Sequence, residues 1–172
     1  MQLPAGGSCT CSQVRGLARR LTGVYDAALA QHGLTVTQYA ALITLARATE
    51  PLAVGELAQR LQMDRSTTTR LLAPLERAGL VAQPAAAHAP RGAQADHRAR
   101  LLRLTPRGER RLQAAVPAWA AAQQHVDALL GATLVKSLAR ATRAATRALV
   151  ADRSRDAQPG AARSPRARKV IR

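Results

Sequence analysis

The sequence is short of aromatic residues, of long apolar runs and of any leader segment, and each shortage excludes a class of protein. It has no Phe, one Trp and two Tyr, which argues against binding of single-stranded nucleic acid, because that binding stacks bases on aromatic side chains. No apolar run approaches the ~20 residues that a membrane-spanning helix requires. The start, MQLPAGGSCTC, lacks the basic residues and apolar stretch of a signal peptide. We therefore expect a cytoplasmic protein with reduced thiols and no membrane span.

Acidic residues are also scarce, with 10 Asp and Glu against 26 Lys and Arg, which gives a net charge of +16. Such a charge favours an anionic partner, either nucleic acid or an acidic membrane surface. The sequence shows no Gly-rich phosphate loop and no HExxH motif, and its four histidines lie in separate predicted elements. Cys9 and Cys11 lack the second pair of ligands that a zinc site needs. We expect no enzymatic activity, no cofactor and no metal.

Two short helical patterns occur in close succession in the middle of the chain. Only Gln62 and Met63 separate the first pattern from Asp64, a favourable N-cap for the second, and Gly79 follows the second where a helix C-terminus favours glycine. The apolar residues that repeat at helical spacing are Leu57, Ala58 and Leu61 in the first pattern and Leu71, Leu72, Leu75 and Ala78 in the second. This arrangement predicts a helix-turn-helix motif.

Two strand candidates follow, at residues 80–82 and 101–104, and residues 52–53 are a third short candidate. Pro84, Pro90 and Gly92 rule out regular structure between the first two, so these strands are predicted to form a hairpin with a long mobile tip. A helix-turn-helix followed by such a hairpin is a winged helix.

The motifs that identify a family are DRSTTTRLL from Asp64 to Leu72, Leu75-Glu76 with Gly79-Leu80-Val81, Asp96-x-Arg98, and Leu104-Thr105-x-x-Gly108. In this order they resemble the MarR family of bacterial transcriptional regulators, over roughly residues 12 to 150. The resemblance implies a mainly α fold with a small β-wing, in which a winged helix-turn-helix DNA-binding domain is joined to a helical dimerisation region formed by both chain ends.

The outer face of the second helix is the candidate DNA contact. With the leucines inward, the helical period also turns Thr68 inward and leaves four polar residues outside: Arg65, Ser66, Thr69 and Arg70. Hydroxyls and guanidiniums near a helix N-terminus suit phosphates and base edges of double-stranded DNA. An ordinary solvated face is the alternative.

The wing supplies two further candidates. By resemblance, Arg98 is the wing arginine, which either reaches the minor groove or braces the wing on Asp64 or Asp96. Arg91 lies nearer the tip, where it would act as a purely electrostatic contact with DNA.

The domain organisation predicted from these patterns has four parts. Residues 1–11 are a disordered N-terminus, 12–34 and 106–150 form the helical dimerisation region, 35–105 are the winged helix-turn-helix, and 152–172 are a basic disordered tail. A last helix from Thr133 to Val150 carries an apolar seam of Leu134, Leu138, Ala141, Ala145 and Leu149, with its basic residues off that seam. In MarR-like proteins the first and last helices pair across a two-fold axis, so a homodimer is expected.

Two kinds of regulatory site follow from the resemblance. Small aromatic or phenolic effectors bind MarR-like proteins between the first two helices and the helix after the wing. There Arg15 and Arg19 share a helix face, His32 lies at its end and Trp119 could supply an aromatic wall. Some relatives instead sense oxidants through an N-terminal cysteine, and a thiol at a helix start near Arg15 favours that chemistry. A disulfide between Cys9 and Cys11 is sterically poor, which leaves bonding across the dimer or sulfenic acid, and two inert thiols are the alternative.

The basic tail and the net charge keep a second class of function open. From Asp152 onward the chain has seven Lys or Arg and two Asp, a net +5, which is either a solvated tail or an arm that neutralises phosphates. The main hypothesis is a sequence-specific, ligand-responsive repressor that binds a pseudo-palindromic operator. A charge-driven DNA-compacting protein is the competing reading, a thiol-based repressor is an alternative switch, and an interaction domain without a DNA role is a distant third.

Overall fold

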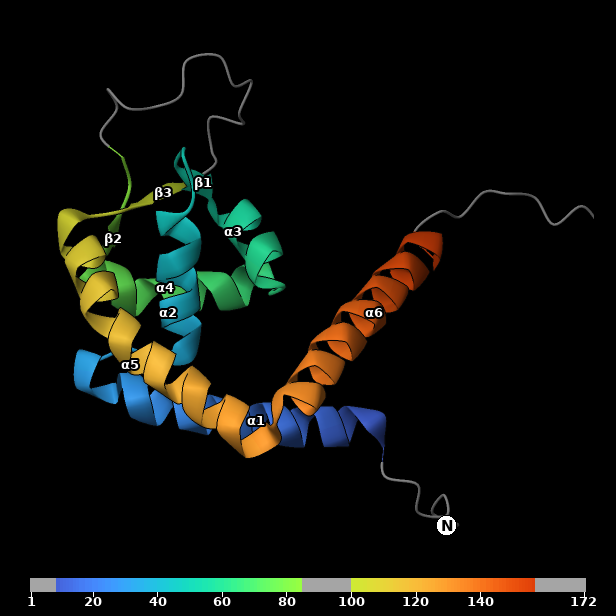
Figure 1. The fold of residues 1–172 in the computed structure, drawn as a ribbon. Coiled ribbons are helices and arrows are strands. Elements are labelled where there is room, and N and C mark those ends of the chain that lie inside the picture. Colours follow the sequence, from blue (N-terminus) through green and yellow to red (C-terminus); the bar gives the residue numbers. More distant parts are fainter. Residues whose placement is uncertain (1–8, 85–99, 157–172) are drawn as a thin grey trace, which may run out of the picture. The chain divides into compact units, whose positions relative to one another are not determined.

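The computed structural model describes residues 9–84 and 100–156, with side chains as far as Asp152. Within these ranges the protein is mostly helical with one small antiparallel sheet, as the sequence predicts (Figure 1). The predictions for Arg91, Arg98, the wing tip and residues 157–172 lie outside the described residues. The chain forms two compact units, Met1–Val126 and Asp127–Arg172. The first helix and most of the helix after the wing belong to the same unit as the winged helix.

The first helix, α1 (Thr10–Leu29), is followed by a 3-10 turn, η1 (Ala30–His32). This turn is capped by Gly33, whose φ of 64° favours glycine. The predicted disordered segment 1–11 is wrong at its end, since Thr10 and Cys11 are helical. The helix starts before Ser12 because the Cys9 carbonyl accepts the Gln13 N–H at 3.1 Å, so the first turn forms without a side-chain cap.

The second helix, α2 (Val36–Ala46), is fixed at its start by two sets of hydrogen bonds. Thr35 forms a capping box with Gln38, which selects Thr35 over Thr37 as the cap. The Val36 N–H donates to Oδ1 of Asp26 on α1 at 2.7 Å, which ties the two helices together. In Figure 1, α2 lies at the centre of the first unit, with the sheet at one end and α1 at the other.

The helix-turn-helix and wing form as predicted. The helices are α3 (Val54–Leu61) and α4 (Arg65–Arg77), and the strands are β1 (Leu52–Ala53), β2 (Val81–Ala82) and β3 (Leu101–Leu104). The sheet order is β1-β3-β2, and the hairpin pairs Val81 with Leu104 and Ala82 with Arg103. Between α3 and α4, Gln62 adopts a φ of 55°, a conformation that non-glycine residues seldom adopt.

The core of the first unit is built mainly from leucine, because the sequence has so few aromatic residues. Its largest fully buried side chains include Leu29, Leu42, Leu57, Leu72, Leu75 and Leu102. The helix after the wing, α5 (Pro106–Leu130), contributes Leu112 and Ala115 to this core. It also contributes Trp119, whose ring stacks on Tyr39 of α2 with centroids 5.8 Å apart. These contacts hold α5 against the same core that supports α4.

The second unit contains the last helix, α6 (Ala132–Asp156), which begins after Gly131 at a φ of 74°. It extends six residues past the predicted end at Val150, so the predicted disordered tail is wrong at its start and residues 152–156 are helical. The reason lies in the sequence, because no glycine or proline occurs between Gly131 and Pro159, and Ala and Arg favour helix.

Candidate nucleic-acid interface

The N-terminus of α4 is organised by the carboxylate of Asp64. Its Oδ1 accepts the Thr67 N–H at 2.8 Å and the Ser66 hydroxyl at 2.6 Å, and its Oδ2 accepts the Thr67 hydroxyl at 2.6 Å. The hydrogen bonds from Ser66 and Thr67 hold the pKa of the Asp64 carboxyl well below its ordinary value. Asp64 is thus an ionised N-cap at neutral pH, and it fixes the first turn of α4.

The predicted outer face of α4 is exposed, and its residues come together. Arg65, Ser66, Thr69 and Arg70 are exposed and line one shallow hollow of about 510 Å³. Thr68 is fully buried, as the helical period predicts, and its hydroxyl donates to the Asp64 carbonyl at 3.0 Å. The helix also continues through Pro74 to Arg77. The fold therefore presents these four side chains side by side on a surface that a partner can reach.

The hydroxyl groups and the arginines of this face differ in what they can offer a partner. The Ser66 hydroxyl donates to Asp64, and the Thr69 hydroxyl donates to the Arg65 carbonyl at 2.8 Å. Their protons are directed toward the protein, so their free lone pairs can accept hydrogen bonds from outside. Neither Arg65 nor Arg70 forms an ion pair with any acidic residue in the described ranges. The face thus combines two available cations with two outward acceptors.

The wing is tied to α4 by contacts that the sequence analysis missed. Arg100, just before β3, forms an ion pair with Glu76 on the last turn of α4. Thr105, which follows β3, donates its hydroxyl to the Gly79 carbonyl at 2.7 Å and its N–H to the Leu80 carbonyl at 3.1 Å. Glu76 belongs to the Leu75-Glu76 motif, but nothing in the sequence identified Arg100 as its partner. These bonds fix the base of the wing relative to α4.

The four predicted effector residues do not meet in one pocket. Arg15 and Arg19 line a shallow hollow of about 620 Å³ on α1, together with Thr22 and Asp26. His32 lies 13 residues after Arg19 on the same helical path, roughly 20 Å away at ~1.5 Å per residue. The ring of Trp119 is stacked on Tyr39 against the core instead of lining that hollow. The two arginines are therefore the part of the predicted site that the fold brings together.

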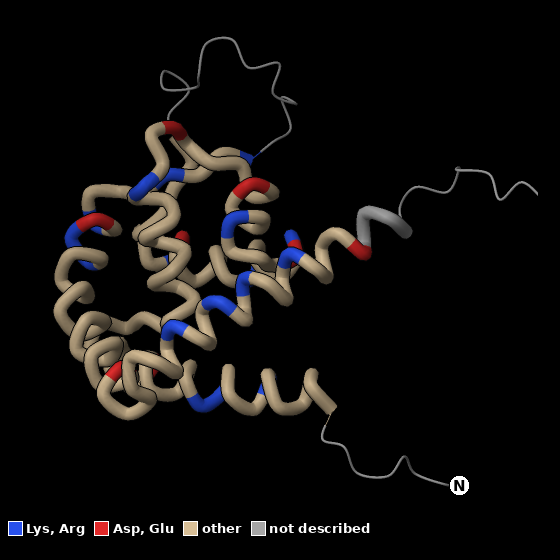
Figure 2. The backbone as a smooth tube through the Cα atoms, turned by 45° about the vertical axis from the view of Figure 1, so that its right-hand side comes forward, with Lys and Arg blue, Asp and Glu red and all other residues tan. Residues whose placement is uncertain are grey.

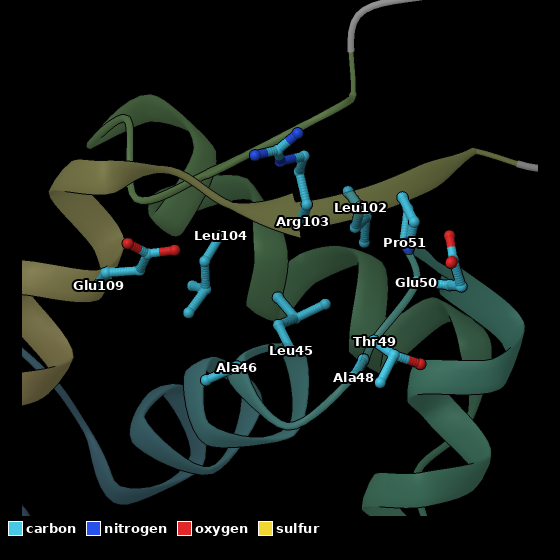
Figure 3. Close-up of a pocket in the computed structure, with 10 residues that line it drawn as sticks. All are labelled: Leu45, Ala46, Ala48, Thr49, Glu50, Pro51, Leu102, Arg103, Leu104 and Glu109. Atoms are coloured by element: carbon cyan, nitrogen blue, oxygen red, sulfur yellow. The ribbon is translucent and has the colours of Figure 1, made fainter. Parts of the chain in front are cut away.

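Another hollow lies where no ligand site was predicted. It measures about 460 Å³ and is formed by the end of α2, the loop to β1, the strand β3 and the first turn of α5 (Figure 3). Its base is apolar, from Leu45, Leu102 and Leu104, while Arg103 and Glu109 lie at its sides. No sequence motif marked it, because its residues come from four elements that only the fold assembles.

The two cysteines are both free and exposed at the start of α1, where Cys9 is the N-cap residue and Cys11 lies in the first turn. In the described part of the chain, no three His, Cys, Asp or Glu side chains gather as metal ligands would. None of the described helices is long and apolar enough to cross a membrane.

Comparisons with known proteins agree with this geometry. Residues 32–91 match the model of the MarR family, whereas no curated protein sequence matches the chain significantly. The structure is similar to the Mycobacterium tuberculosis transcriptional regulator MosR, with a TM-score of 0.67 and 33% identity over 83% of this chain and 99% of MosR. MosR in complex with DNA gives a TM-score of 0.66 and 34% identity over 82% and 98% of the two chains.

A third structure is a M. tuberculosis MarR family protein in complex with salicylic acid. It is 26% identical, with a TM-score of 0.57, over 80% of this chain and 96% of its own. The family model covers the helix-turn-helix and the start of the wing, and the likeness to MosR extends over most of the chain. The chain therefore belongs to the MarR family of transcriptional regulators.

Proposed function

We propose that this protein binds double-stranded DNA as a homodimer and represses transcription from a pseudo-palindromic operator until a small aromatic or phenolic carboxylate releases it. The observation that carries the proposal is the grouping of Arg65, Ser66, Thr69 and Arg70 on one exposed face of α4. The complex of the related MosR with DNA supports the same partner for this chain.

The chemistry of the face assigns a role to each pair of residues. An arginine can pair with guanine through two hydrogen bonds or contact a phosphate as a cation. Ser66 and Thr69 donate inward, so toward DNA they act as acceptors, which suits the amino groups of adenine or cytosine. Arg65 and Arg70 then provide the attraction to DNA, while the hydroxyls discriminate between bases.

The homodimer is proposed from apolar side chains that the single chain leaves uncovered. Val14 is 61% and Leu17 37% exposed on α1, and Leu134 is 47% and Leu149 67% exposed on α6. Burial of these side chains between two copies would stabilise the dimer through the hydrophobic effect. Two recognition helices related by two-fold symmetry fit major grooves about 34 Å apart, which requires a pseudo-palindromic site.

The DNA proposal is tested by measuring binding to a fragment upstream of the protein's own gene and to random DNA across a salt series. Arg70→Ala should weaken operator binding by about 1–3 kcal/mol if the arginine reads a base, and should relax specificity at one position. Arg110→Ala, which removes an exposed arginine from α5, is the matched control. Equal affinity for operator and random DNA at every salt concentration would instead favour a charge-driven DNA-compacting protein.

The effector proposal rests on Arg15 and Arg19, whose shared hollow offers two cations to a carboxylate. Salicylate is the probe, because a related MarR family protein was crystallised with salicylic acid. Salicylate should lower DNA affinity, and Arg15→Gln or Arg19→Gln should reduce that effect. Arg20→Gln, on another side of α1, should respond as the wild type does. An unchanged response in both hollow variants would contradict this site.

A thiol-based switch is the second candidate, favoured by the exposure of Cys9 and Cys11. Exposed thiols react readily with peroxide when they are deprotonated. If peroxide releases DNA from the wild type but not from Cys9→Ser or Cys11→Ser, the switch is redox. Mass spectrometry under non-reducing conditions then identifies the oxidised species.

A further inference from the structure

A row of four cations runs along α6 on the side opposite its apolar seam. Lys136, Arg140, Arg143 and Arg147 are all exposed, and their spacing places them within about 60° of one another around the helix axis. The seam residues, from Leu134 to Leu149, are centred on the other side of the helix. Figure 2 shows Lys and Arg recurring along this helix. The helix therefore has two separate faces, one basic and one apolar.

The charges of the basic row do not stabilise the helix through ion pairs. A solvated charged face usually alternates signs, because acidic and basic residues three or four positions apart attract one another. No acidic residue lies three or four positions from any of the four cations. The neighbours at that spacing are instead the other cations of the row, which repel one another. The two acids of α6, Asp152 and Asp156, both follow Arg147, the last cation of the row.

We propose that this basic row is a second DNA-contact surface, which binds the phosphate backbone of duplex DNA without reading sequence. The four cations span about 16 Å of helix, while duplex DNA carries one charge per ~1.7 Å. Thr133 and Ser137 add hydroxyls beside the row, and together with Lys136, Arg140 and Arg143 they line a hollow of about 420 Å³. Hydroxyls and cations are the groups that most often contact phosphates.

The arrangement favours DNA over an acidic membrane. A helix that lies on a membrane inserts its apolar face, and cations help when they flank that face near the headgroups. Here the cations lie directly opposite the seam, so an inserted seam would hold them away from the lipid. The seam also contains only leucine and alanine, without the Trp or Phe typical of interfacial helices.

The test removes charge from the row in the full-length protein. Arg140→Gln with Arg143→Gln lowers the charge by two and keeps good helix-forming residues. Arg107→Gln with Arg110→Gln, on α5, is the control with the same change in charge. Binding to random duplex DNA is measured across a salt series, and helix content by circular dichroism. Both pairs are repeated in an Arg70→Ala background, which separates the row from the recognition helix.

The α6 pair should make the slope of log affinity against log salt shallower by about 1.8, because each lost phosphate contact removes ~0.9. This shallower slope should persist in the Arg70→Ala background, even if specific binding is lost there. The proposal for the basic row and the proposal for the α4 contact can therefore fail independently of each other. Equal slopes for the α6 and α5 pairs would overturn the proposal, since net charge alone would then explain binding. The proposal would also be overturned if the α6 pair left the salt slope of DNA binding unchanged but abolished binding to vesicles that contain anionic phospholipid.

Discussion

Gly108 packs too closely against the wing for any side chain to fit. A Cβ at this position would lie 2.1 Å from the carbonyl oxygen of Leu80 and 3.1 Å from Cδ2 of Leu104. The nearest atom belongs to the backbone, so it cannot move aside as the end of a side chain would. That same carbonyl accepts the Thr105 N–H at 3.1 Å. We therefore expect Gly108→Ala to push α5 away from the wing and strain this hydrogen bond.

The expected loss is the sum of three effects. Overpacking of this kind costs about 1–3 kcal/mol, and loss of the Thr105 hydrogen bond costs about 1 kcal/mol. Alanine regains at most about 1 kcal/mol over glycine through its helix propensity. The free energy of unfolding should thus fall by roughly 2 kcal/mol, which corresponds to a melting temperature lower by about 4–8 °C in a chain of this length.

The assay is thermal unfolding followed by far-ultraviolet circular dichroism, with Gly23→Ala as the matched control. Gly23 lies within α1, and a Cβ there would meet nothing within 4 Å. That substitution should raise the melting temperature, because alanine restricts the unfolded chain and favours helix. If Gly108→Ala were as stable as Gly23→Ala, the packing of α5 on the Leu80 carbonyl would not be what requires glycine.

Three further predictions concern α4, the dimer and the wing. Asp64→Asn should make the free energy of unfolding depend less on pH. In the wild type, the lowered pKa of the Asp64 carboxyl stabilises the fold above the ordinary pKa of 3.8, and this stabilisation is lost as the pH falls below that value. Acid unfolding curves of both proteins test this. Leu138→Asp should give monomers in analytical ultracentrifugation and abolish specific DNA binding; a dimeric variant would exclude the α6 seam as the interface. Glu76→Gln should break the ion pair with the partly exposed Arg100 and lower the free energy of unfolding by less than about 1 kcal/mol. It should nevertheless weaken operator binding measurably. Unchanged affinity for the operator would show that this pair does not position the wing.

The winged helix could be predicted in detail because its signals are local. Asp64 is a strong cap followed at once by leucines at helical spacing, and this combination correctly turned Thr68 inward. The strands were equally clear, since prolines and glycines bounded them. The ends of α1 and α6 were less certain, because a helix can begin without a side-chain cap and continue until a proline or glycine stops it.

The contacts between elements could not be predicted in the same way. Arg100 and Glu76 are 24 positions apart, and either could have paired with several other charged residues. The hollow beside β3 draws on four elements, so no single stretch of sequence marks it. The effector residues were predicted from a family resemblance, which does not specify how far His32, at the end of the first helical segment, lies from Arg19. The distance between two residues of one helical segment follows from their spacing in the sequence, and a family resemblance alone does not take that distance into account.

The stacking of Trp119 on Tyr39 gives the protein a built-in fluorescent reporter. Trp119 is the sole tryptophan of the sequence, and it lies partly buried where α5 packs on α2, inside the first compact unit. Its emission should therefore follow the melting of that unit without any label, whereas circular dichroism also records the helix of the second unit. Coincident transitions by the two probes would mean that α6 unfolds together with the winged helix. Separate transitions would mean that the last helix melts as an independent element.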